Sequence, residues 1–149
     1  LAQFATEAGT AAVQLLLVSA VRLTSLCLPH LERSGRGRVI TITSSSVKEP
    51  IDNLALSNAV RPGVVGWSKT LARELGPKGV RVNAVCPGFI RTPILDTIPD
   101  AVKQKMVEKV PLGRLGNPEE IASVYAFLAS DDASYLNGAV IEVSGGIQL

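Results

Sequence analysis

The chain has 149 residues, of which 46% are hydrophobic and 19% charged, and its formal net charge is +2. A chain of this length supports one domain at most, and its composition excludes an intrinsically disordered protein. Basic and acidic residues are interleaved along the chain, so the concentrated positive surface that nucleic acid or an anionic membrane would need is not expected.

The first predicted element is a long helix over residues 10–33, where apolar residues recur at three- and four-residue spacing. Its apolar stretch, residues 11–31, approaches the length of a membrane span, but Gln14, Arg22 and Pro29 interrupt it. A mostly buried helix of an α/β protein is therefore the favoured interpretation. No basic leader precedes a small-residue cleavage site, so no secretory signal is expected and a cytoplasmic location is predicted.

Strand and helix patterns alternate along the rest of the chain. The predicted strands cover residues 38–43, 80–85 and 139–143, and the predicted helices cover residues 54–75 and 117–130, with a loop and a short amphipathic helix before residue 110. Strands rich in Val and Ile and separated by helices predict a parallel sheet with helices on both faces. Ligands bind such sheets beyond the carboxyl ends of the strands, here residues 44–47, 87–92 and 144–146.

Three single residue types add further expectations. Cys27 and Cys86 lie far apart within apolar segments and lack metal-ligand spacing, which predicts reduced, buried thiols and no metal site. The chain begins at Leu1 and its only methionine is Met106, so an upstream segment is expected to be missing. Pro62 lies inside a predicted helix, where it removes a backbone hydrogen bond and favours a kink.

Several strings resemble the short-chain dehydrogenase/reductase family in order and spacing. They are residues 28–31 (LPHL), 43–45 (TSS), 69–75 (KTLAREL), 82–93 (VNAVCPGFIRTP), 111–116 (PLGRLG), 118–122 (PEEIA), 127–130 (FLAS) and 144–146 (SGG). Together they span nearly the whole chain. The sequence is most similar to the 3-oxoacyl-acyl-carrier-protein reductases, in particular to a divergent branch without the standard active-site residues.

The resemblance implies an α/β fold, namely the C-terminal half of a doubly wound Rossmann-type parallel sheet. The family's sheet has seven strands, and a Gly-rich turn that binds the dinucleotide follows the first of them. Residues 1–149 would supply the last three strands and their flanking helices as the C-terminal part of one such domain. No Gly-rich turn follows a strand in this sequence, so the dinucleotide-binding N-terminal part is expected to be absent from it.

The resemblance also implies positions for the catalytic residues, and three of the four carry a changed residue. A Tyr general acid, a Lys four residues later, a substrate-orienting Ser and a water-holding Asn fall on Ser57, Arg61, Ser44 and Leu16, with Ser45 and Ser46 as alternatives to Ser44. Residues four apart share one helix face, so Ser57 and Arg61 still point the same way. A serine is a poorer proton donor than tyrosine, whereas Arg61 could bind ribose or phosphate, or form an ordinary ion pair.

The loop after the second strand matches the family's cofactor-covering pattern, which assigns Pro87, Gly88, Ile90 and Thr92 to cofactor binding. The alternative is that Pro87 and Gly88 only end the strand. NAD and NADP are not distinguished. Lys48 and Glu49 follow the serine cluster, where they either face a substrate pocket or are solvated loop charges.

Two functions follow from the resemblance. One is an NAD(P)-dependent oxidoreductase acting on a small-molecule carbonyl or alcohol, such as a 3-oxoacyl thioester, through a degenerate active site. The other is a catalytically inactive member that binds a ligand or assembles. Residues 1–149 alone are not expected to catalyse. The strand edge next to the missing fourth strand would be unpaired, which predicts a homo-oligomer or association with the N-terminal half.

Overall fold

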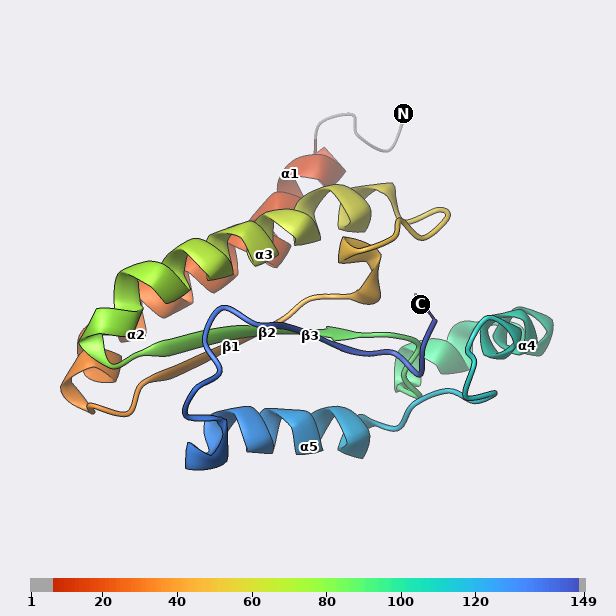
Figure 1. Cartoon of the computed structure of the whole chain (residues 1–149). Helices are drawn as coiled ribbons and strands as arrows, with labels where there is room; N and C mark the ends of the chain where they lie inside the picture. Colours follow the sequence, from red (N-terminus) through yellow and green to blue (C-terminus); the bar gives the residue numbers. More distant parts are fainter. Residues whose placement is uncertain (1–6, 148–149) are drawn as a thin grey trace.

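The computed structural model describes residues 7–147 of the chain, and helices and strands alternate as predicted (Figure 1). A π-helical turn, Gln14–Val18, joins the first two helices into one continuous rod. The strands are β1 (Arg38–Ile42), β2 (Arg81–Pro87) and β3 (Val140–Val143), and the helices are α1 (Glu7–Val13), α2 (Ser19–Arg33), α3 (Ala55–Leu75), α4 (Asp100–Glu108) and α5 (Pro118–Ala129).

The three strands form one parallel sheet in the order β1-β2-β3, which confirms the predicted fold class. Ile42 pairs with Val85 across the first strand pair, and Cys86 pairs with Glu142 across the second. Because all three strands run the same way, their carboxyl ends meet at one side of the molecule. The N-terminal end of α3 and helix α4 lie at that side as well (Figure 1).

Helices cover both faces of the sheet, as the alternation of elements predicts. Helices α2 and α3 lie over one face and α5 lies under the other (Figure 1). The cluster on the α3 face is built from the buried residues Ala72, Leu75, Val80 and Val82. The cluster on the α5 face is built from the buried residues Val85, Ile121, Leu128 and Ala133. Alternate residues of β2 thus serve the two cores, because successive strand side chains point to opposite faces.

At the amino ends of the strands, two polar side chains of β2 organise the connection from α5 to β3. The side-chain amide of Asn83, which is 2% exposed, donates to the carbonyl of Leu136 at 2.9 Å and accepts from the amide of Ala139 at 3.0 Å. The Arg81 guanidinium donates to four backbone carbonyls, those of Leu128, Ser130, Ala133 and Leu136. Burial lowers the pKa of Arg81, but the guanidinium stays charged and caps the end of α5.

The prediction that the N-terminal helix is mostly buried is wrong for this chain, since none of the described residues of α1 and α2 is buried. Cys27 is exposed, contrary to the prediction of a buried thiol, whereas Cys86 is buried as predicted. The physical reason is that, among residues 7–147, this helix packs along α3 on one side only, so Leu15 and Leu26 keep 72% and 67% of their surface.

The segment Glu7–Arg33 is also long and apolar enough to cross a membrane by length and composition alone. The core helix of a soluble protein passes the same test. The π-helical turn and α1 contact α3 on one side, and none of the segment's residues is buried. The absence of a membrane partner stays a prediction.

Helix α3 carries the two candidate site residues Ser57 and Arg61, and it is one α-helix from Ala55 to Leu75. Pro62 lies inside it without ending it. The turn before α3 is held by the Asn58 side chain, which donates to the Ile51 carbonyl at 2.8 Å and accepts from the Ile51 amide at 3.3 Å. The start of the helix is therefore fixed to the loop that leads back to β1.

Candidate functional site at the carboxyl ends of the strands

The serine cluster that follows β1 forms a short 3₁₀ turn, Ser45–Val47, with Ser44 as its N-cap. The Ser44 hydroxyl oxygen accepts a hydrogen bond from the Ser46 amide at 3.1 Å. Ser45 and Ser46 are 1% and 2% exposed, whereas Ser44 is half-buried. Of the three alternatives in the sequence, Ser44 is thus the serine with a surface left for a ligand, and its role stays a prediction.

Ser57 and Arg61 are joined directly, one helical turn apart on α3. The Arg61 Nε–H donates to Ser57 Oγ at 2.9 Å, and Arg61 Nη1 donates to the Thr43 carbonyl at 3.1 Å. Because Thr43 immediately precedes Ser44, the structure brings all three predicted catalytic positions to one place. Ser57 accepts rather than donates in its bond to Arg61, so its own proton remains free to point to a ligand.

Arg61 is half-buried, and burial lowers its pKa. A guanidinium starts so far above neutrality that it remains charged. The alternative of an ordinary ion pair is not seen, since no carboxylate among residues 7–147 pairs with Arg61. Its two bonds use two of five N–H donors, and the remaining donors suit an oxygen-rich ligand such as a ribose or a phosphate.

Neither tyrosine of the chain can replace the missing general acid from where it lies. Tyr125 is on α5, on the opposite face of the sheet from Ser57, and burial raises its pKa to about 12. Tyr135 lies fully exposed in the connection from α5 to β3, at the amino end of the sheet. Within the described residues, Ser57 is therefore the hydroxyl nearest to the family's tyrosine position.

The predicted cofactor loop continues from the end of β2 as an ordered strap, Phe89–Thr92, and both interpretations of Pro87 and Gly88 stay open. The Gly88 amide donates to the Val143 carbonyl at 3.0 Å, and a Cβ at Gly88 would lie 2.7 Å from Ser144 Cα, so only glycine fits. Ile90 bridges to Gly116, and Thr92 is half-buried before the 3₁₀ turn Pro93–Thr97. Pro87 is the last residue of β2. Cofactor binding by these four residues stays a prediction.

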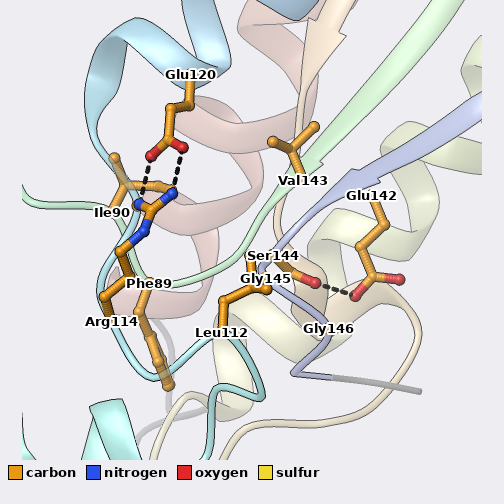
Figure 2. A pocket seen from close by; sticks show the side chains of 11 residues that line it. Phe89, Ile90, Leu112, Arg114, Glu120, Glu142, Val143, Ser144, Gly145 and Gly146 are labelled. Atoms are coloured by element: carbon orange, nitrogen blue, oxygen red, sulfur yellow. Dashed lines mark hydrogen bonds and ion pairs between the residues drawn. The ribbon is translucent and has the colours of Figure 1, made fainter.

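A cavity of about 380 Å³ opens between this strap, the N-terminal end of α5 and the end of β3 (Figure 2). Phe89, Ile90, Leu112 and Val143 provide apolar walls, and the charged groups at it are Arg114, Glu120 and Glu142. Sequence reasoning did not single out these charged residues. Glu142 offered one signal, because it is the only charged residue in an otherwise Val- and Ile-containing strand.

Arg114 and Glu120 form a two-pronged ion pair at this cavity, with N–O distances of 2.8 and 2.6 Å (Figure 2). Glu120 also accepts from the Asn117 amide at 2.7 Å, which fastens the start of α5. The Arg114 hydrogen bond is the main reason that the pKa of Glu120 falls to about 2. Arg114 and Glu120 thus bind each other, and the pair stabilises the start of α5.

Lys48 and Glu49 differ in what they meet. Lys48 is an exposed loop charge, as the solvated alternative expected, and its Nζ also forms an ion pair with Glu142 Oε2 at 2.5 Å. That hydrogen bond raises the pKa of Lys48. Glu49 lines a second cavity of about 380 Å³ together with Pro50, Ile51, Asp52, Phe89, Lys109 and Ile147. None of Ser44, Ser57 and Arg61 is among the residues that line this cavity.

Two kinds of site expected of other enzyme classes are not formed by residues 7–147. No three His, Cys, Asp or Glu side chains in that range are grouped so that they could hold a metal ion. Cys86 is buried against Thr43 Oγ1 at 3.0 Å, and burial raises the pKa of its thiol. A thiol held in its protonated form is a poor nucleophile. The polar chemistry at the strand ends therefore rests on hydroxyls and a guanidinium.

A parallel sheet with helices on both faces and polar residues gathered at the carboxyl ends of its strands has the arrangement of a Rossmann-like fold. Comparison with known proteins agrees. A family profile described as enoyl-(acyl carrier protein) reductase matches residues 1–148. The chain belongs to the short-chain dehydrogenase/reductase family and resembles its 3-oxoacyl-(acyl-carrier-protein) reductases.

Three relatives illustrate the match. The (3R)-3-hydroxyacyl-CoA dehydrogenase of Rattus norvegicus is 47% identical over 115 residues, which is 76% of this chain and 44% of that protein. The 3-oxoacyl-(acyl-carrier-protein) reductase of Thermotoga maritima is 38% identical over 143 residues, 95% of this chain and 57% of that protein. The crystal structure of the corresponding Brucella melitensis reductase has a TM-score of 0.93 at 29% identity, covering 97% of this chain and 55% of that chain.

The chain spans about half the length of the curated relatives it matches. The descriptions also differ in chemistry, because the profile is named for enoyl reduction and the relatives for 3-oxoacyl or 3-hydroxyacyl groups. What the comparisons share is an oxidoreductase family and its fold.

Proposed function

We propose that the full-length protein is an NAD(P)-dependent reductase of a carbonyl substrate, with Ser57 and Arg61 in place of the family's Tyr and Lys. The observation that carries this proposal is the 2.9 Å hydrogen bond from Arg61 Nε to Ser57 Oγ. It directs the lone pair of the serine to the cation and leaves the hydroxyl proton available to a substrate oxygen.

In this mechanism Ser57 donates a hydrogen bond to the carbonyl oxygen, and Ser44 orients that oxygen from the neighbouring turn. The nicotinamide cofactor, when bound, supplies the hydride. As negative charge grows on the oxygen, the fixed positive charge of Arg61 behind Ser57 stabilises it. Arg61 cannot give up a proton at neutral pH, so the proton that completes the alcohol comes from water through Ser57.

The substrate class follows from what the pair can recognise. Ser57 and Arg61 present N–H and O–H donors, which stabilise an oxyanion directly, and this favours reduction of a C=O bond. The relatives named for 3-oxoacyl and 3-hydroxyacyl groups support a 3-oxoacyl thioester. The second cavity has apolar walls at Pro50, Ile51 and Phe89 that would suit an acyl chain, beside the charged Glu49, Asp52 and Lys109.

The rest of the proposed site would come from a part equivalent to the N-terminal half of the relatives. That part would carry the adenosine side of NAD or NADP and pair with the open edge of β1, where Ile42 is 58% exposed. The exposed apolar residues of α1 and α2 support assembly into a homo-oligomer. A cytoplasmic location accords with such an enzyme and is proposed with it.

A second candidate is an inactive protein that binds a ligand through the same strand ends. It is favoured by the chemistry of Ser57, since an aliphatic alcohol has a pKa several units above that of a tyrosine phenol. Ligand binding without turnover would then be the function. Arg61 would serve this role equally well.

The test is nicotinamide absorbance against time, with the full-length protein, NADPH or NADH, and an acetoacetyl thioester. Ser57→Ala is expected to lower kcat about 100-fold, the effect of removing one oxyanion donor. Ser123→Ala is the matched control, because Ser123 bonds only the carbonyl of Glu119 on an exposed helix face. Turnover that is indifferent to Ser57→Ala would contradict the proposed role.

Absence of turnover in the unmodified protein, with activity appearing in a Ser57→Tyr plus Arg61→Lys variant, would support the inactive candidate instead. Titration of NADPH fluorescence distinguishes the two readings further. The inactive candidate requires binding that Arg61→Met weakens.

A further inference from the structure

A row of polar side chains crosses the sheet at the ends of the strands, on the face that α3 covers. Thr43 Oγ1 contacts Cys86 Sγ at 3.0 Å, and Cys86 pairs in register with Glu142 of β3. Arg61 reaches the start of this row through the Thr43 carbonyl at 3.1 Å. Lys48 closes its far end through Glu142. The row therefore links the Ser57-Arg61 pair to the opposite edge of the sheet.

Glu142 is held more completely than an ordinary surface carboxylate. Its side chain keeps 16% of its surface, and Oε2 accepts from Lys48 Nζ at 2.5 Å. Oε1 accepts from the Ser144 hydroxyl at 2.7 Å (Figure 2). A mostly buried carboxylate without partners would be costly, so its pairing is a requirement of this position. By comparison, Lys78 and Glu32 form an ion pair whose side chains are 53% and 33% exposed.

Lys48 belongs to the serine turn. It is the C-cap of the 3₁₀ turn Ser45–Val47, and its amide donates to the Ser45 carbonyl at 3.0 Å. The turn follows β1, and Glu142 lies in β3, so the ion pair connects two segments on either side of the end of β2. The Lys48–Glu142 ion pair thus connects the serine turn to β3.

We propose that Lys48 and Glu142 are positioning residues that hold the Ser44 turn against the ends of β2 and β3. The turn is tied at its start by Arg61 and at its end by Lys48. Through Ser144, the same carboxylate fixes the segment that packs on Gly88 at the base of the strap Phe89–Thr92. The consequence for catalysis rests on the proposed function, whereas the consequence for the order of the turn does not.

The first experiment is hydrogen–deuterium exchange of the full-length protein. The Ser46, Val47 and Lys48 amides report on the turn, since each donates to Ser44 or Ser45. Lys48→Met and Glu142→Gln are expected to speed exchange of these amides about fivefold, and Lys48→Arg to leave it near the unmodified rate. Lys78→Met is the matched control and leaves it unchanged. Unchanged exchange in both Lys48→Met and Glu142→Gln would overturn the proposal.

A charge-swapped variant keeps the test sharp if single changes weaken the fold. Lys48→Glu plus Glu142→Lys is expected to restore slow exchange of the turn amides relative to Lys48→Glu alone. Failure to do so would count against the positioning role of the ion pair. Where the protein turns over a thioester, Lys48→Met is expected to lower kcat about tenfold with KM for the cofactor unchanged. Absence of turnover would refute the proposed reductase activity. The exchange result would still decide whether Lys48 and Glu142 hold the Ser44 turn.

Discussion

The amino end and the carboxyl end of the sheet each carry an arginine that reaches backbone carbonyls, and the two differ in how much of their hydrogen-bonding capacity is used. Arg81 donates to four carbonyls at the amino end. Arg61 donates to one carbonyl and one hydroxyl at the carboxyl end. Arg81 uses four of its five N–H donors to support the fold, whereas Arg61 uses two of five and has more donors left for a ligand.

The buried amide of Asn83 gives the largest expected effect on the structural end. Asn83→Leu leaves the Ala139 amide without its partner and the Leu136 carbonyl with Arg81 alone, so the free energy of unfolding should fall by about 3 kcal/mol. Urea denaturation of the full-length protein measures this. A change below about 1 kcal/mol would show that the connection from α5 to β3 is held by other contacts.

Arg61 should show the reverse pattern. Arg61→Met is expected to lower kcat/KM for carbonyl reduction about 100-fold, because the positive charge behind Ser57 is lost. The free energy of unfolding should change by less than about 1 kcal/mol, since the residue makes two local bonds. A large loss of stability with unchanged kinetics would place Arg61 in the same class as Arg81.

Arg81→Met is the direct counterpart and should lower the free energy of unfolding by about 2 kcal/mol, because four carbonyls lose a shared cap. Arg81→Lys should recover only part of this, since an ammonium does not reproduce the planar fork. Thermal unfolding measures both. Arg73→Met, an exposed change on α3, is the control and should have little effect.

Ser46 offers a smaller effect of opposite sign. Its hydroxyl oxygen is buried without a hydrogen-bond partner among residues 7–147. Ser46→Ala removes this unpaired group and should raise the free energy of unfolding by about 1 kcal/mol. The Ser44 cap uses the Ser46 amide and survives the change. Destabilisation would mean that the hydroxyl is bonded in solution.

The smallest effect is the pH dependence due to Glu120, whose pKa is lowered from 4.5 to about 2 by Arg114 and the Asn117 amide. The folded state binds this proton more weakly than the unfolded state does. The stabilisation is therefore present above pH 4.5 and is lost as the pH falls toward 2. Glu120→Gln should flatten this part of the Tm profile, and salt should weaken the effect because the pair is exposed.

Much of the candidate site was predictable because it depends on spacing. The i,i+4 relation of Ser57 and Arg61 and the strand-end location of Ser44 follow from helix and strand periodicity. The Lys48–Glu142 ion pair was not predictable, because 94 residues separate its partners. Only the parallel pairing of β1, β2 and β3 brings the turn after β1, which carries Lys48, close to Glu142 of β3.

The exposure of the N-terminal helix was missed for a related reason. Apolar spacing predicts which face of a helix avoids water, and it does so from local sequence alone. Whether that face is covered depends on which other elements are present, and in residues 7–147 the helix is contacted by α3 and β1, which leave Leu15 and Leu26 exposed.

The sequence by itself determined the alternation of elements, the parallel sheet, the family and the residues at each catalytic position, because these depend on local periodicity and on short strings. Tertiary structure alone decided that Arg61 bonds Ser57 and Thr43, that Glu142 pairs with Lys48, and that Arg81 spends its donors on the fold. Side-chain partners distant in sequence are chosen by the register of the strands and by burial, which favours every polar group finding a partner.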